Sequence, residues 1–188
     1  MKNLKSIALA LVAFVSFATT AQTTKKVDAS KSTINWVGKK VTGSHEGTIT
    51  LKEGALIFKG KKVVGGNFTV DMTTINTTDL EGKGKANLDG HLKSDDFFGV
   101  EKFPTATLVF KSIGEKGNGV YAVTADLTIK GKTESIKFDL TVAGNTASTT
   151  LKVDRTKYDI KYGSGSFFSD LGDKTIYDDF ELTVKLAI

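Results

Sequence analysis

The stretch Val120–Val142, VYAVTADLTIKGKTESIKFDLTV, decides the fold. Apolar and polar residues alternate along its first half, from Tyr121 to Ile129, and again along its second half. Because successive side chains of an extended backbone point to opposite faces, each half predicts a β-strand with one apolar face. The short polar turn Lys130-Gly131-Lys132 joins the two halves, so the strands are expected to be antiparallel neighbours.

The same alternation recurs along most of the chain. Gly-containing polar turns separate the runs, and the sequence contains only one proline, Pro104. The further runs are Thr33–Lys39, Gly47–Phe58, Lys62–Met72, Thr105–Phe110 and Phe180–Ile188. About eight antiparallel strands with one apolar face predict an all-β protein, and closure into a barrel would remove the exposed edges. A two-sheet sandwich fits the same pattern.

One segment, Thr77–Gly99, interrupts the alternation with TTDLEGKGKANLDGHLKSDDFFG. Leu88 and Leu92 lie one helical turn apart, and Thr78 or Asp79 is the predicted N-cap. Several glycines lower the helix propensity of the segment. We therefore expect a short irregular helical insertion between two strands.

The first residues, Met1–Ala21, have the order of a secretory signal peptide. Lys2 and Lys5 precede an apolar run from Ile7 to Ala18, which small residues follow. We expect residues 22–188 to form a single domain that is periplasmic or secreted after removal of this leader. No second apolar run approaches the ~20 residues of a spanning helix, so the mature protein is expected to be soluble and not membrane-spanning.

Charge and cysteine content exclude several classes of protein. The net charge of +5 comes almost wholly from lysine, because Arg155 is the only arginine. Nucleic-acid readers rely on arginine forks and clustered charge, so we expect no nucleic-acid partner. The absence of cysteine excludes disulfides, thiolate metal sites and cysteine nucleophiles.

Signals for catalysis are weak. The two histidines, His45 and His91, are far apart in the sequence, whereas a catalytic metal site commonly needs about three protein ligands. No serine lies in a G-x-S-x-G motif. The GKT of Gly131–Thr133 joins two predicted strands and opens no helix, so it is a hairpin and not a phosphate loop. We expect no enzyme, no metal and no required cofactor.

The unusual feature of the composition is its apolar aromatic content. Twelve phenylalanines include the adjacent pairs Phe97-Phe98 and Phe167-Phe168, both in segments without strand alternation. Because exposed phenylalanine pairs are costly, these pairs either plug the ends of a barrel or frame the mouth of an apolar cavity. A barrel of about eight strands has an interior that side chains can fill or that can hold one small ligand.

Several motifs together resemble those of the YceI-like family. They are LDGHLKSDDFF at Leu88–Phe98, KFPTAT at Lys102–Thr107, LTIKGKT at Leu127–Thr133, the first strand at Val27–Trp36 and GGNF at Gly65–Phe68. The resemblance extends from about Lys26 to Ile188. It implies an exported, lipocalin-like antiparallel barrel that binds isoprenoid chains, such as polyprenyl or quinone-type lipids, or a similar long amphiphile.

Strand parity then gives the candidate lining of an apolar cavity. Even positions of Lys62–Met72, among them Val64, are apolar, and Phe68, Val70 and Met72 are predicted to face inward. The predicted ligand-binding residues are Trp36, Phe68, Val70, Met72, Leu92, Phe97, Phe98, Leu108, Phe110, Leu127, Phe138, Leu140, Phe167, Phe168 and Leu182. A polar head group would remain at the mouth, where the candidates that meet it are His91, Lys93, Tyr158 and Tyr162.

Two functional hypotheses follow from the sequence. The first is a periplasmic binding protein that holds a long-chain lipid in an apolar cavity, where about 25 cal/mol per Å² of buried apolar surface would stabilise the complex. The second is a structural or interaction protein with a filled barrel, no ligand, and surface loops that meet a partner or a second copy in a homodimer.

Overall fold

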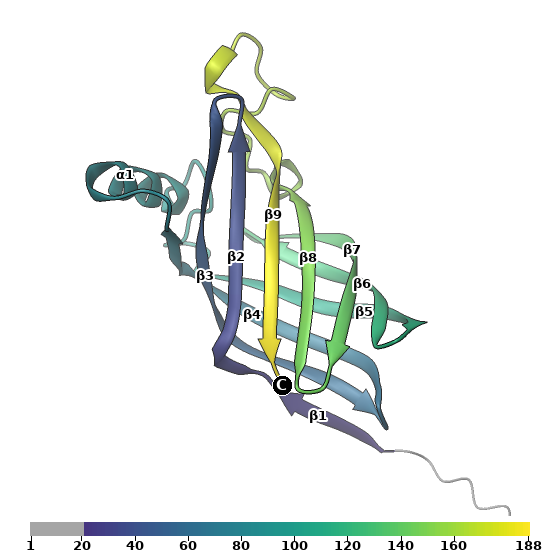
Figure 1. Cartoon of the computed structure of the whole chain (residues 1–188). Coiled ribbons are helices and arrows are strands. Elements are labelled where there is room, and N and C mark those ends of the chain that lie inside the picture. Colours follow the sequence, from purple (N-terminus) through teal and green to yellow (C-terminus); the bar gives the residue numbers. More distant parts are fainter. Residues whose placement is uncertain (1–20) are drawn as a thin grey trace, which may run out of the picture.

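The computed structural model describes residues 21–188, which form a closed antiparallel barrel of eight strands with one extra strand and one α-helix (Figure 1). The strands are β1 Gln22–Lys26, β2 Asp28–Lys40, β3 Gly43–Lys59, β4 Lys62–Thr77, β5 Thr105–Gly117, β6 Val120–Ile129, β7 Lys132–Ala143, β8 Thr146–Asp154 and β9 Ile176–Ala187. The helices are α1 Gly82–Lys93 and the 3₁₀ turns η1 Arg155–Tyr158 and η2 Gly172–Lys174. Apart from Ala21, the predicted signal peptide lies outside the described residues.

Pairing between β3 and β4 closes the barrel. The strands follow the order β3-β2-β9-β8-β7-β6-β5-β4, and β4 returns to β3. β1 pairs with the second half of β3, beyond the point where the β2–β3 pairing ends. The closed barrel confirms the barrel prediction and excludes the sandwich. All side chains of β1 are exposed, so no alternation marked this strand in the sequence.

Two apolar clusters fill the ends of the barrel. We call the end that holds the C-terminus the lower end, and the end above which residues 161–175 project the upper end (Figure 1). At the lower end Phe110 packs against Phe68 and Phe138, with ring centroids 5.7 and 5.9 Å apart. At the upper end Leu92 and Phe97 pack over the opening. Leu108, Phe138 and Leu182 pack against both clusters, so the two clusters are continuous along the inside of the barrel.

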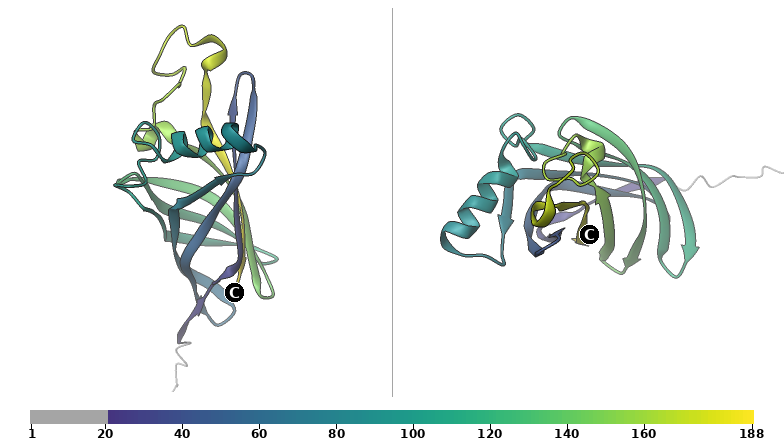
Figure 2. Two further views of the ribbon diagram at one scale, coloured as in Figure 1. Left: turned by 90° about the vertical axis from the view of Figure 1, so that its left-hand side faces the viewer. Right: turned by 90° about the horizontal axis from the view of Figure 1, so that it is seen from above.

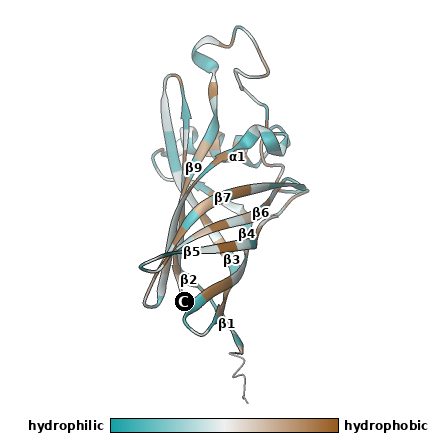
Figure 3. Cartoon of the chain, turned by 90° about the vertical axis from the view of Figure 1, so that its right-hand side faces the viewer, coloured by the Kyte–Doolittle hydropathy of each residue, from teal (hydrophilic) through white to brown (hydrophobic). Residues whose placement is uncertain are grey.

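The helix lies outside the barrel wall and contributes little to the core (Figure 2). Only Leu92 of α1 is buried, and the helix is largely hydrophilic (Figure 3). The N-cap prediction was wrong, because α1 begins after Glu81, which makes no side-chain cap. The Asp79 carboxylate instead accepts the backbone N–H of Glu46 and pairs with His45 Nδ1 at 2.9 Å. Asp79 therefore fastens the segment before the helix to β3.

Among the described residues, no helix has the length and apolarity needed to cross a membrane.

The apolar face of Lys62–Met72 does not continue to Val64 in the structure. Val63 is buried and Val64 is 41% exposed. The pairing of β3 with β4 shifts register at this point, so a β-bulge reverses the parity of the strand. A bulge depends on the facing strand, and the alternation of β4 alone does not show it.

The seam between β7 and β8 is the weakest part of the wall. Backbone pairing joins these strands only from Thr141–Ala143 to Thr146–Ser148, after which they diverge (Figure 1). The turn η1 follows β8 and packs against β7 at the wide end of the seam. Tyr158 is 1% exposed there, and it fills space that no hydrogen-bonded strand occupies.

Aromatic rings inside the barrel require glycine on the facing strand. Trp36 lies opposite Gly47, where a Cβ would come within 2.5 Å of the Trp36 ring and would also clash with the carbonyl oxygen of Asn76. A Cβ at Gly66 would similarly lie 2.8 Å from the ring of Phe110. Because these glycines have no side chain, the aromatic rings can occupy the volume next to them.

We predict that Gly47→Ala lowers the free energy of unfolding by at least about 1–3 kcal/mol, the usual cost of overpacking, because the clash involves backbone as well as the ring. Urea denaturation followed by circular dichroism measures the change. The matched control is Gly90→Ala in α1, where an added Cβ meets no atom within 4 Å. Alanine favours a helix, so the control is expected to gain up to about 1 kcal/mol. Equal stability of the two variants would contradict the packing argument.

Candidate functional site

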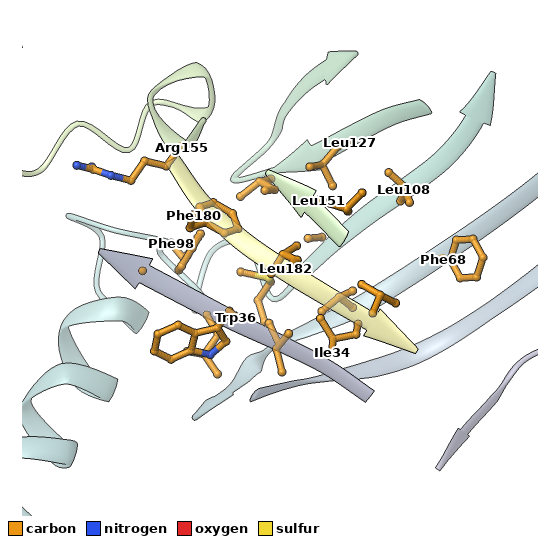
Figure 4. A pocket seen from close by; sticks show the side chains of 18 of the residues that line it. Ile34, Trp36, Phe68, Phe98, Leu108, Leu127, Leu151, Arg155, Phe180 and Leu182 are labelled. Atoms are coloured by element: carbon orange, nitrogen blue, oxygen red, sulfur yellow. The ribbon is translucent and has the colours of Figure 1, made fainter. Parts of the chain in front are cut away.

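An apolar cavity lies inside the barrel between the two apolar clusters (Figure 4). Its volume is about 180 Å³, and residues from all eight barrel strands line it. The lining runs from Phe68 and Leu186 near the lower end to Ile129 and Ile176 at the upper end. Because the volume is small and the lining extends from one end of the barrel to the other, we describe the cavity as a narrow channel.

Most of the residues predicted from strand parity lie in this lining. They are Trp36, Phe68, Val70, Met72, Leu92, Phe97, Phe98, Leu108, Phe110, Leu127, Phe138, Leu140 and Leu182. Phe97 and Phe98 follow α1 and contact each other with centroids 5.1 Å apart, and Phe98 also contacts Phe180 at 6.3 Å. The pair after α1 thus belongs to the upper lining of the cavity.

The lining includes further residues that the sequence reasoning did not select. The apolar ones are Ile34, Ile49, Leu51, Ile75, Ala106, Ile129, Leu151, Ile176, Phe180, Val184 and Leu186. Strand parity would have found most of them, because they share faces with selected residues. The remaining ones are Gly38, Lys39, Thr149, Arg155, Tyr177 and Asp179, for which alternation gave no signal.

The expected place of Phe167 and Phe168 in the lining must be corrected. Both rings lie outside the cavity and are 50% and 51% exposed. Their backbone N–H groups donate to the carbonyl of Ser164 in one tight turn. Ser164 is fully buried and bridges to Ile176, so the turn is held at the rim with its rings toward solvent.

The four predicted head-group residues do not line the cavity either. His91 packs between Phe97 and Tyr162, with ring centroids at 5.5 and 4.4 Å. Lys93 ends α1 outside the barrel, and Tyr158 is buried in the seam. Their positions follow from contacts between distant segments, which motif spacing did not show.

Arg155 is a buried charged group at the upper end of the barrel, and it binds several backbone groups there. Its Nε and Nη2 donate to the carbonyls of Tyr177 and Ile176 at 3.1 Å, and its Nη1 donates to that of Ile160 at 2.8 Å. The side chain is 2% exposed, and burial lowers the pKa of its guanidinium. In Figure 4 the guanidinium points away from the labelled leucines of the cavity. Arg155 therefore anchors the loop at the rim and leaves the channel apolar.

Asp178 completes this anchor. Its Oδ1 lies 3.7 Å from Arg155 Nη2, and its Oδ2 accepts the hydroxyl of Ser166 at 2.5 Å. Burial alone would raise the pKa of this carboxyl, but hydrogen bonds from Ser164 and Ser166 and the charge of Arg155 outweigh burial and lower it. The Arg155–Asp178 pair thus links β8, β9 and the loop of residues 161–175.

Apolar contact dominates the chemistry of the cavity, although Lys39, Thr149, Arg155, Tyr177 and Asp179 also belong to its lining. Pockets for small molecules commonly have volumes of about 300–1,000 Å³, so side chains of the lining would have to move to admit a ligand larger than the 180 Å³ of this channel. Among residues 21–188, no group of three or more His, Cys, Asp or Glu side chains could hold a metal ion. The arrangement is suited to a slender apolar molecule, which would gain stability from surface buried along the channel.

Comparison with known protein families gives a match over nearly all described residues. A family model for the YceI-like domain matches residues 26–188. A UPF0312 protein of Shewanella denitrificans is 38% identical over 84 residues, which are 45% of this chain and 42% of that protein. A UPF0312 protein of Staphylococcus aureus is 42% identical over 71 residues, 38% of each chain. The chain therefore aligns with about two fifths of these relatives.

Solved structures share the fold. The crystal structure of Burkholderia cenocepacia BcnA has a TM-score of 0.65 and 25% identity, and the match covers 86% of this chain and 99% of BcnA. A polyisoprenoid binding domain from Saccharophagus degradans, implicated in plant cell wall breakdown, has a TM-score of 0.59 and 16% identity, with 86% and 95% covered. The YCEI protein of Campylobacter jejuni has a TM-score of 0.55 and 18% identity, with 100% and 98% covered.

The Arg155–Asp178 anchor predicts a loss of stability in acid. The folded-state pKa of Asp178 lies below its ordinary value of 3.8, so the ionised carboxylate stabilises the fold above that value. This contribution is lost as the pH falls through the folded-state pKa. We expect Asp178→Asn to lower the unfolding free energy by about 1–3 kcal/mol near neutral pH, and the difference from wild type to shrink below about pH 3.

Urea denaturation between about pH 2 and pH 7 tests this expectation. The control is Asp170→Asn, an exposed carboxylate of the same loop with a positive φ that asparagine tolerates. A constant difference between Asp178→Asn and wild type at every pH would show that the carboxylate does not act through its charge.

Tyr158 provides a second prediction. Its hydroxyl is buried without a hydrogen-bond partner, and burial raises its pKa to about 12. Tyr158→Phe removes an unsatisfied polar atom, so we expect the free energy of unfolding to change by less than about 0.5 kcal/mol or to rise. Denaturation measures the stability, and the ultraviolet titration should lose the phenol that ionises near pH 12. A loss above about 1.5 kcal/mol would reveal a hydrogen bond made by this hydroxyl.

Proposed function

Because this chain belongs to the YceI-like family, we propose that its barrel binds one long apolar chain, of the isoprenoid class or a similar amphiphile, along the central channel. The observation that carries the proposal is the narrow apolar cavity lined from all eight barrel strands. An extended chain places most of its surface against such a lining. A polyprenyl or quinone-type tail has that shape.

The neighbouring structures support the choice of an isoprenoid. The Saccharophagus degradans domain of the same fold is a polyisoprenoid binding domain. The lining here is rich in leucine, isoleucine and phenylalanine and includes Met72, whose unbranched side chain adapts to an irregular branched chain. Apolar recognition of this kind needs no polar anchor within the channel.

We also propose where the protein acts. The sequence of Met1–Ala21 favours export, so the proposed protein acts as a periplasmic or secreted carrier of its lipid. An enclosed apolar cavity would shield such a lipid from water during carriage. No catalytic step is part of the proposal.

The direct experiment is mass spectrometry of an organic extract of the purified, folded protein. The expected result is a long-chain isoprenoid or similar lipid in about equal molar amount to the protein, as one channel implies. A fluorescent fatty acid should bind saturably to the extracted protein. Geranylgeraniol should displace it and cholesterol should not, because the channel is narrow. Extracts without lipid, together with no saturable probe binding, would contradict the proposal.

A cavity-filling variant separates a hollow barrel from a filled one. Ala106 is buried in the lining on β5, so Ala106→Leu occupies channel volume. We expect probe binding to weaken about tenfold or more, as overpacking against the ligand costs about 1–3 kcal/mol. The empty protein should keep its stability or gain up to about 1 kcal/mol.

The control is Val109→Leu on the same strand, where the side chain is 45% exposed. It should change neither probe binding nor stability measurably. A filled barrel would give the opposite pattern, in which Ala106→Leu destabilises the protein and the probe binds to none of the variants.

A further inference from the structure

Exposed apolar side chains gather at the upper end of the barrel. Val41, Tyr162, Phe167, Phe168 and Tyr177 are each about half exposed. The other large apolar side chains exposed to a similar degree among the described residues, Val64 and Val109, lie on the barrel wall. The asymmetry sets the upper end apart from the rest of the surface.

These side chains belong to one structural unit. Val41 occupies the turn of the β2–β3 hairpin, and its N–H donates to the carbonyl of Thr175 at 3.1 Å. Residues 161–175 rise above the barrel next to this hairpin (Figures 1 and 2). The N–H of Ile176 donates to the carbonyl of Gly163, and the Arg155–Asp178 pair fixes the base of the loop. The rings are therefore presented from an anchored loop.

The upper end is also where the channel approaches the surface. Tyr177 and Lys39 line the cavity, and both are exposed. A series of contacting rings runs from Tyr162 through His91, Phe97 and Phe98 to Phe180 in the lining. A path of ring contacts thus connects the projecting loop with the channel.

We propose that this end of the barrel docks on a lipid bilayer, with Phe167 and Phe168 inserted below the head groups and Tyr162 and Tyr177 at the interface. Tyrosine rings favour the boundary between head groups and acyl chains, and phenylalanine favours its apolar side. Lys161 lies 5.0 Å over the ring of Phe167, a position from which its ammonium can remain among the head groups.

The type and position of the exposed side chains, together with their charge, favour a bilayer over a protein partner. Their exposed area, roughly 400–500 Å² together, lies on a projecting loop and a hairpin end, and its tyrosine and phenylalanine rings match the interfacial and apolar layers of a bilayer. Within the loop, Lys161 and Lys174 are balanced by Asp170 and Asp173. Apolar insertion and not charge is therefore the source of binding, and the docking should depend little on anionic lipid.

Sedimentation with vesicles tests the docking directly. We expect wild type to bind vesicles of phosphatidylcholine and of phosphatidylethanolamine with phosphatidylglycerol (3:1) with partition coefficients within about threefold of each other. The double variant Phe167→Ser/Phe168→Ser should lose about tenfold or more in partition coefficient, because it removes the inserted rings. The control Val64→Ser/Val109→Ser changes the exposed side chains of the wall and should bind as wild type does. Equal binding by the two double variants would overturn the proposal.

A second measurement does not depend on truncation. Phe168→Trp keeps an aromatic ring at the tip, and its added fluorescence should be quenched by lipids brominated on the acyl chain. Val109→Trp should be unaffected. Absence of quenching at position 168 overturns the insertion. A concentration-dependent dimer that Phe167→Ser/Phe168→Ser abolishes, without vesicle binding by wild type, would replace the bilayer by a second copy and also overturn the proposal.

Docking on a bilayer should also speed the uptake of a ligand from that bilayer. This consequence rests on the proposed function, and docking and ligand binding are tested separately. Phe167→Ser/Phe168→Ser should bind a fluorescent fatty acid from solution with wild-type affinity but take it from vesicles about tenfold more slowly. Ala106→Leu should dock on vesicles normally but retain little of the probe. Docking without any probe binding by wild type would contradict the carrier function alone. Probe binding without docking would contradict the membrane proposal alone.

Discussion

Closure of the sheet between β3 and β4 is the constraint on which the rest of the structure depends. A closed barrel shields inward side chains from water, and an unpaired polar group buried there would cost several kcal/mol. Eight strands leave an interior that side chains nearly fill. Trp36 and Phe110 fit only because Gly47 and Gly66 carry no Cβ on the facing strands. The channel is the space that remains after these rings are packed.

The two ends of the barrel have different physical roles. At the lower end the rings of Phe68, Phe110 and Phe138 pack together and seal the interior. At the upper end the closure depends on connecting segments that follow α1 and β8. Arg155 joins the residues after β8 to the start of β9 through the backbone carbonyls of Ile160, Ile176 and Tyr177, and its guanidinium lies 5.6 Å from the ring of Phe97 in the segment after α1.

The distribution of charge is consistent with an apolar cargo. The buried charge of Arg155 is directed to the loop and to Asp178, and not into the channel. The wall is least bonded at the β7–β8 seam, where the buried ring of Tyr158 takes the place of strand pairing. The projecting loop then carries its aromatic rings outward, which places apolar surface where a lipid phase and the channel would meet.

The sequence by itself determined seven of the nine strands of the described residues, all but β1 and β8, and most of the lining. Alternation is a local property of an extended backbone, so Phe68, Leu127 and Leu182 could be assigned to the interior from parity alone. The YceI-like motifs identified the family and thereby the barrel.

Only the tertiary structure decided the positions that depend on contacts between distant segments. The bulge at Val64 comes from its pairing with β3, and Tyr158 enters a seam because β7 and β8 diverge. Phe167 and Phe168 face solvent because a turn without periodicity is anchored through Ser164 and Ile176. The anchoring role of Arg155 could not be predicted from the sequence, since its partners are backbone carbonyls and the carboxylate of Asp178 on β9. Local patterns fix which way a strand side chain points, whereas loops, bulges and seams are fixed by the segments they meet.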